Sequence, residues 1–90
     1  MASIRIPTPL RKLTNEIEVV NTDATTLRDA VEKLESDFPG IKERIVDEGG
    51  EIRRFVNIYI NGDDVRFLDN LNTPLKPGDD VSIVPAVAGG

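Results

Sequence analysis

Two segments near the start of the chain alternate polar and apolar residues. Residues 3–6 follow this alternation, and residues 16–19 repeat it with Ile17 and Val19 on one side. A period of two is typical of a strand that places one face on a hydrophobic core. The sequence therefore predicts two strands that pair antiparallel, joined by a longer loop that begins at Pro7.

An amphipathic helix is predicted over residues 25–37. Its apolar residues recur at helical spacing and form one stripe, which comprises Leu27, Ala30, Val31, Leu34 and Phe38. Thr25 or Thr26 is the expected N-cap, and Pro39-Gly40 ends the helix. A second, shorter helical segment is expected at residues 41–46, followed by a polar loop.

The clearest strand pattern in the sequence lies at residues 54–60. Two faces are expected to alternate there, one with Val56, Ile58 and Ile60, the other with Phe55, Asn57 and Tyr59. The Asn61-Gly62 pair that follows is a strong hairpin signal. Residues 64–67 are therefore expected to return as a second strand, with turns at 71–75 and 76–79.

A last strand is predicted at residues 81–84, with Val81 and Ile83 inward and Val84 outward. The resulting order predicts an α+β fold with a mixed sheet of four to five strands and one main helix across one face. A right-handed crossover through the helix would make the strand after it parallel to one before it. The expected organisation is one domain over residues 1–86 and a flexible C-terminal tail at residues 87–90.

Composition argues against an enzyme with its own active site. The 90 residues include no cysteine and no histidine, so a thiol nucleophile, a cysteine metal site and the commonest general base are missing. The acidic pairs Asp63-Asp64 and Asp79-Asp80 stand in turn contexts, which account for them. We expect no catalytic residue and no metal site in this chain.

Charge and hydropathy exclude two further classes of protein. The net charge of −5 disfavours nucleic-acid binding, which depends on basic residues that neutralise phosphates. No apolar run approaches the length of a membrane span, and residues 1–5 lack the pattern of a signal peptide. The expected location is the cytoplasm.

The Gly89-Gly90 pair follows directly on the last predicted strand. Glycine has no Cβ, so a strip of glycine backbone can enter a channel too narrow for other residues. A rigid strand before it would aim that strip at a partner. The competing interpretation is that the pair is an accident of a disordered end.

Four runs carry a resemblance to a known family: residues 55–61, 64–67, 77–79 and 83–90. They are similar to the ubiquitin-like sulfur carriers of the MoaD/ThiS family, and closest to the CysO type. Molybdopterin-type carriers commonly have two prolines before the tail, whereas here Ala86 replaces the second. The resemblance implies a ubiquitin-like β-grasp fold.

The resemblance also implies the chemistry. An E1-like adenylating enzyme would use ATP to activate Gly90, and sulfide or a persulfide donor would then leave a thiocarboxylate there. In CysO-like systems the sulfur passes to a pyridoxal-phosphate enzyme of the cysteine synthase type, and a metallopeptidase releases the cysteine. The carrier itself would bind no cofactor.

Three alternatives to the cysteine pathway stay open. The sulfur could serve molybdopterin or another metabolite, or Gly90 could join the chain to target proteins as a ubiquitin-like modifier. The chain could also be a non-covalent interaction module, for which Gly89-Gly90 would be incidental.

Two groups of residues are the expected functional sites. The first is the tail, where Gly90 would carry sulfur and Val87, Ala88 and Gly89 would thread into a partner. The second is a partner interface on the sheet face that the helix leaves uncovered. It would consist of Phe55, Tyr59, Val84 and Ala86, with acidic residues around its apolar centre.

Overall fold

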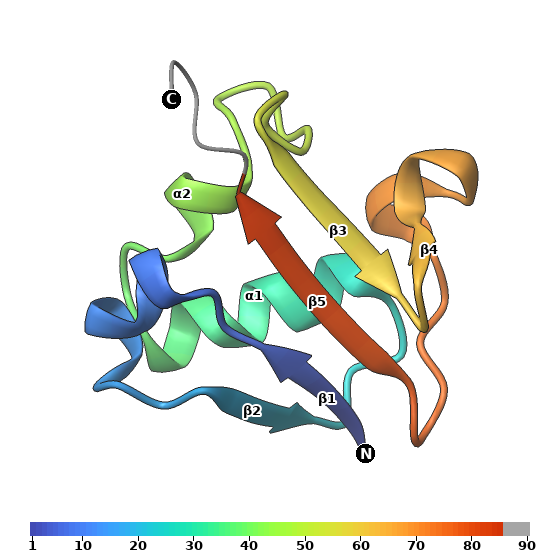
Figure 1. Ribbon diagram of the computed structural model, residues 1–90. Coiled ribbons are helices and arrows are strands. Elements are labelled where there is room, and N and C mark those ends of the chain that lie inside the picture. The colour runs from blue at the N-terminus through green and yellow to red at the C-terminus, as the bar shows by residue number, and fades with distance from the viewer. Residues whose placement is uncertain (86–90) are drawn as a thin grey trace.

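A five-stranded mixed sheet forms the centre of the computed structural model, which describes residues 1–85 (Figure 1). The strands are β1 (Ala2–Arg5), β2 (Val19–Thr22), β3 (Val56–Ile60), β4 (Asp63–Asp64) and β5 (Asp80–Pro85). The main helix α1 (Leu27–Asp37) crosses one face, and the short helix α2 (Lys42–Ile45) follows it. The expected α+β class is confirmed, while the predicted boundary at residue 86 and the tail at 87–90 lie outside the described residues.

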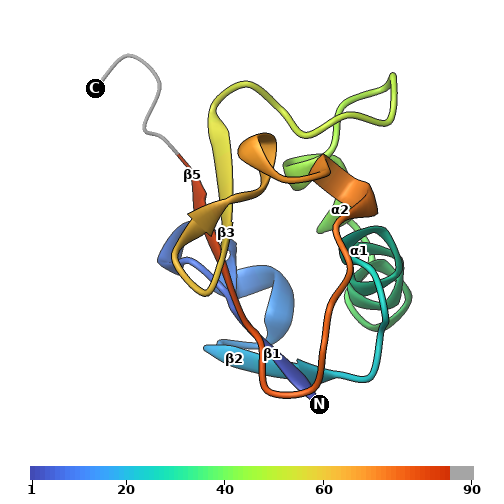
Figure 2. The same cartoon turned by 90° about the vertical axis from the view of Figure 1, so that its right-hand side faces the viewer.

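The strands are arranged in the order β2-β1-β5-β3-β4. The central pair β1·β5 is parallel, and the pairs β1·β2, β3·β5 and β3·β4 are antiparallel. Consequently β2 and β3 run in the same direction on either side of that central pair. This is the relation that a crossover through α1 predicts, and both helices lie on the same side of the sheet (Figure 2).

The predicted helix stripe forms the helical half of the core. Thr26 caps α1, because its side-chain oxygen accepts a hydrogen bond of 3.1 Å from the Asp29 amide. The buried residues of the stripe share one cluster with those of β3 and β5: Leu27, Ala30, Val31, Leu34, Val56, Ile58, Ile60, Val81 and Ile83. Phe38 is partly buried against this cluster, as is expected at the end of the stripe.

The second strand begins where the sequence pattern predicted that it would end. Residues 8–14 form a 3₁₀ helix, after which Asn15 and Glu16 both adopt left-handed backbone, with φ of 54° and 65°. This reversal keeps residues 16–18 out of the sheet, so the strand prediction for 16–19 is wrong. Ile17 and Val19 are each 41% exposed instead of facing the core.

The predicted return strand at residues 64–67 is also wrong, because only Asp63 and Asp64 pair with β3. A 3₁₀ turn follows at Val65–Phe67, and the Asp64 carboxylate accepts a hydrogen bond of 2.9 Å from the Arg66 amide. Val65 is buried and Phe67 is 87% exposed, although a strand would place both on one face. The hairpin turn itself is confirmed, with positive φ at Asn61 and Gly62.

The connection between α1 and α2 is held by one carboxylate. Glu35 accepts hydrogen bonds from the Lys42 amide at 2.9 Å and the Gly40 amide at 3.1 Å. These backbone bonds, first that of Lys42 and then that of Gly40, lower the pKa of Glu35 below its ordinary value. The ionised form of Glu35 is therefore the one that stabilises this connection.

Core truncation gives the first prediction. Leu34 is 2% exposed and Ile58 is fully buried, on opposite sides of the helix–sheet interface. Replacing either by alanine should cost about 2–5 kcal/mol of unfolding free energy, the usual range for a buried aliphatic side chain. Denaturant unfolding measures this, with Val19→Ala on an exposed position as control. If both core variants unfold at the same midpoint as the control, the proposed helix–sheet packing is wrong.

The second prediction concerns acid stability. A lowered native pKa adds stability that is present above the ordinary glutamate pKa and is lost as the pH falls through the native pKa. Glu35→Gln should therefore be less stable than the wild type at neutral pH, and the difference should shrink in acid. Thermal unfolding at a series of pH values measures it, with the exposed Glu48→Gln as control. A difference that stays constant across the acid range would contradict the role of the Glu35 charge.

Candidate functional site

The chain leaves the sheet from its central strand. β5 pairs with β1 through residues 80–82 and with β3 through residues 81–85, where Pro85 lies opposite Val56. β5 lies between two strands over its first half and is paired with β3 up to Pro85, so the direction of the chain at Pro85 is defined. The expected functional residues Ala86, Val87, Ala88, Gly89 and Gly90 lie outside the described part of the chain.

Two of the predicted interface residues share the sheet face opposite α1, here called the outer face. In the β3·β5 register Val84 lies opposite Asn57, and Ser82 lies opposite Tyr59. Val84 and Tyr59 are thus diagonal neighbours, a separation that an aromatic side chain can span. Val84 is 45% exposed and Tyr59 is partly exposed, so both are accessible close to the end of β5.

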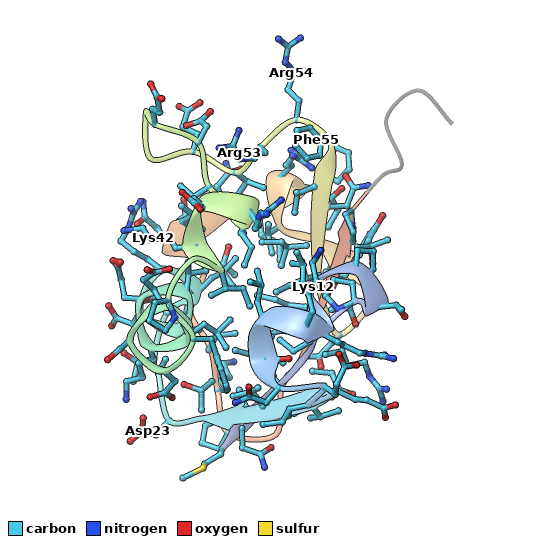
Figure 3. The ribbon with its side chains drawn as sticks, turned by 90° about the vertical axis from the view of Figure 1, so that its left-hand side faces the viewer. Lys12, Asp23, Lys42, Arg53, Arg54 and Phe55 are labelled. Carbon is cyan, nitrogen blue, oxygen red and sulfur yellow. The ribbon has the colours of Figure 1, made fainter. Side chains whose placement is uncertain are left out.

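Phe55 lies at the end of this face and not within the strand. It stands in a turn before β3 in which the Val56 amide donates to the Arg53 carbonyl at 3.0 Å. Its side chain is 44% exposed and lines a shallow hollow together with Glu43, Arg44 and Arg53. Figure 3 shows Phe55 at the start of β3 beside Arg53 and Arg54.

The charges nearest Phe55 differ from the expectation. Acidic residues were expected around the apolar centre, but arginines predominate there and Glu43 is the one carboxylate that lines the hollow. The sequence does show the adjacent pair Arg53-Arg54 before the strand. The sequence did not predict that Arg53 lies beside Phe55 in a hollow, because α2 supplies the other wall and approaches only in the folded chain.

Arg66 holds this turn in place, a role that sequence reasoning did not assign. Its guanidinium donates to the Arg53 carbonyl at 2.9 Å, to the Val56 carbonyl at 2.7 Å and to the Asn57 side-chain oxygen at 2.9 Å. One side chain thereby fastens both ends of the turn that carries Phe55. No local sequence signal predicts such a contact, since it joins the segment after the hairpin to the segment before β3.

The acidic turns lie at the other end of β5 and have structural partners. Asp79 accepts from the Lys76 amide at 2.8 Å and from the Asn61 side-chain amide at 3.0 Å, and both bonds lower its pKa. Asp80 accepts from the Ser3 hydroxyl at 2.6 Å. The lowered pKa of Asp79 makes that carboxyl group unsuited to act as a general acid.

Residues 1–85 contain neither a cluster of metal ligands nor a membrane-spanning helix. No group of three or more histidine, cysteine, aspartate or glutamate side chains in this part of the chain is placed to hold a metal ion. Within the same residues, no helix has the length and apolar character needed to cross a membrane.

Comparison with known proteins identifies the family. The model of the ThiS family matches residues 4–90. The sulfur carrier protein CysO of Mycobacterium tuberculosis is 44% identical over 90 residues, which cover 98% of this chain and 97% of that protein. The small archaeal modifier protein 3 of Haloferax volcanii is 41% identical over 68 residues, covering 76% of this chain and 73% of the relative.

A solved structure agrees with the sequence relatives. The crystal structure of the Amycolatopsis orientalis BexX/CysO complex contains a chain that matches with a TM-score of 0.93 and 40% identity, covering 100% of both chains. The fold is the ubiquitin-like β-grasp, as the resemblance implied. Sequence and structure together show that this chain belongs to the ThiS family and is a CysO-like sulfur carrier protein, not an enzyme.

Proposed function

We propose that the carboxyl group of Gly90 carries the sulfur and that the thiocarboxylate formed there donates it in cysteine biosynthesis. The observation that supports this most is the combination of a family match that extends through Gly90 with a sequence that has no cysteine. Without a thiol, a carrier can hold reactive sulfur on a carbonyl carbon. The chain reaches that carbon through residues 86–90, which start from the fixed end of β5.

The proposed activation has two steps, both on partner enzymes. The Gly90 carboxylate attacks the α-phosphorus of ATP and releases pyrophosphate, which leaves an acyl adenylate. Sulfide then attacks the carbonyl carbon, the bond to AMP breaks, and the thiocarboxylate remains. An E1-like adenylating enzyme would supply the ATP site, and the use of ATP agrees with a cytoplasmic location.

In this proposal the carrier contributes the surface that a partner recognises and a C-terminal segment long enough to enter the partner. Five residues follow Pro85, and an extended chain spans at most about 3.3–3.6 Å per residue, so Gly90 can enter a partner to a depth of roughly 17 Å. The outer face with Val84 and Tyr59, and the turn with Phe55, lie at the root of this tail. A partner that binds these residues would receive Gly89-Gly90 in its active site.

The proposed consumer is a pyridoxal-phosphate enzyme of the cysteine synthase type. The thiocarboxylate sulfur would add to the β-carbon of an aminoacrylate on that enzyme, which consumes the carbon–carbon double bond and takes up one proton. The acyl group would then shift from sulfur to the amino nitrogen, so that the thioester bond breaks and cysteine is joined to Gly90 by an amide. A metallopeptidase would then hydrolyse this amide bond. The relatives named CysO support this route, and the BexX/CysO complex supports the binding of such a carrier to a partner protein.

Protein modification is the second candidate function. The identity of 41% with the small archaeal modifier protein 3 supports conjugation through Gly90 to target proteins. Activation of the terminus would be the same in both cases. Isopeptide-linked chain in cell extracts would favour the modifier, whereas free thiocarboxylate would favour the carrier.

The third prediction tests the terminus. Deleting Gly90, or adding one alanine after it, should abolish thiocarboxylate formation, because the reacting carbon would no longer stand at the fixed distance from β5. Purified chain is incubated with ATP, sulfide and the adenylating enzyme, and intact mass reports the exchange of one oxygen for sulfur. Normal loading of either variant would contradict the proposed function, and unchanged circular dichroism shows that the fold is intact.

The fourth prediction tests the apolar part of the interface. Phe55→Ala or Val84→Ala should weaken binding to the adenylating enzyme by roughly 1–3 kcal/mol, the range below the strongest anchors of protein interfaces. Titration calorimetry measures the affinity. Val19→Ala removes a side chain of similar exposure on β2 and serves as control. Affinity equal to that of the control for both variants would place the interface elsewhere.

A further inference from the structure

The turn between β3 and β4 contains an asparagine followed directly by a glycine, the pair Asn61-Gly62. Both residues are exposed, and both adopt left-handed backbone, with φ of 53° and 89°. β5 begins beside this turn, because Ile60 pairs with Val81 in the β3·β5 ladder (Figure 1). The Asn61 side chain therefore lies between the hairpin and the start of β5.

An asparagine that precedes a glycine can be hydrolysed without an enzyme. The glycine backbone nitrogen loses its proton and attacks the asparagine side-chain carbon Cγ, the bond from Cγ to the side-chain nitrogen breaks, and ammonia leaves. The product is a cyclic succinimide. Water then adds to one of its two carbonyl carbons and breaks the bond to the ring nitrogen, which yields either aspartate or isoaspartate. Glycine favours the first step because it has no Cβ to hinder the approach of its nitrogen.

The attacking nitrogen is accessible in the folded chain. Within residues 1–85, no hydrogen bond engages the Gly62 amide. No atom lies within 4 Å of the position that a Cβ of Gly62 would take, so the space around this residue is open to water. The fold thus does not shield the nucleophile of the reaction.

The group under attack, in contrast, is held at both of its polar atoms. The Asn61 side-chain nitrogen donates to a carboxylate oxygen of Asp79 at 3.0 Å, and the Asn61 side-chain oxygen accepts from the Asp80 amide at 2.9 Å. The Asn61 backbone amide also donates to the Asp80 carbonyl, at 2.8 Å. The side chain can turn toward the Gly62 nitrogen only when both of its own hydrogen bonds break.

We propose that Asn61 is a site of hydrolytic modification, and that its hydrogen bonds to Asp79 and Asp80 protect it in the folded chain. The rate of modification then follows the fraction of molecules in which this contact is open. The site lies at the end of the β3·β5 ladder that is opposite to Pro85, so it is separate from the proposed sulfur transfer.

The modified turn could not rebuild this contact. Aspartate at position 61 has no side-chain N–H to donate to Asp79. It also adds a negative charge where Asp63, Asp79 and Asp80 already stand, with Lys76 as the cation that acts on Asp79. Isoaspartate in addition inserts a methylene group into the main chain of the turn between Ile60 and Asp63, which alters the turn geometry that sets the hairpin register. Modified chains should therefore be less stable.

The fifth prediction compares the wild-type chain folded in buffer with the same chain unfolded in urea, both at mildly alkaline pH. Aspartate and isoaspartate at position 61 should form at least about tenfold faster in urea, because the unfolded chain lacks the protecting bonds. Peptide mapping by mass spectrometry measures both products. Asn70 precedes a leucine and serves as internal reference, because a large side chain hinders the attacking nitrogen.

Two variants locate the protection. Asp79→Ala removes the acceptor of the Asn61 side-chain nitrogen, and the folded variant should be modified about threefold to tenfold faster than the wild type. Ser3→Ala removes a hydrogen bond to the Asp80 carboxylate at the same place without touching Asn61, so it is the matched control. Circular dichroism checks that both variants are folded. The product mimic Asn61→Asp should unfold at a lower urea midpoint than the wild type.

Several results would overturn the inference. Equal rates for the folded and the unfolded wild type would show that the contact protects nothing, and the absence of aspartate and isoaspartate at position 61 in urea would show that the pair is not reactive. Equal rates for Asp79→Ala and Ser3→Ala would place the protection elsewhere. An unchanged midpoint for Asn61→Asp would contradict the expected loss of stability.

Discussion

The pairing of β5 with a strand on each side is the constraint on which the rest of this structure depends. Val81 is fully buried and Ile83 is 4% exposed beneath α1, while backbone bonds to β1 and β3 fix the strand laterally. A strand at the edge of a sheet would be held on one side only. β5 lies between two strands over residues 80–82, and its pairing with β3 continues to Pro85, so the position and direction of the chain at Pro85 are set by the sheet.

Because β5 lies inside the sheet, the surface can be described by its faces and by the two ends of this strand. One face of the sheet is covered by α1, and the outer face with Tyr59 and Val84 remains accessible. Along β5, the turn with Asp79 and Asp80 lies at its start, and the turn that carries Phe55 lies beside its end. A carrier protein can influence a reaction through the placement of such regions relative to its terminus.

The elements with strong periodicity could be predicted from the sequence. The stripe of α1 and the alternation of β3 are set by local spacing, and the same alternation placed Tyr59 and Val84 on the outer face. β2 was misplaced because the left-handed backbone at Asn15 and Glu16 leaves no trace in a pattern of polar and apolar residues. The surroundings of Phe55 were missed because Arg66 and α2 approach it only through long-range contacts.

The composition of residues 87–90 supports the proposal that recognition comes from the domain. Val87, Ala88, Gly89 and Gly90 offer small side chains or none, so a channel that accepts them gains little contact with which to reject another small tail. Specificity is a difference between affinities, and larger differences need buried aromatic anchors and charges whose misplacement is costly. Phe55 and Arg53 provide both chemical types in the turn before β3, which Arg66 holds in place. Under the proposed function, discrimination at these residues would leave the terminus thin enough to enter an active site, and the domain would determine which active site it enters.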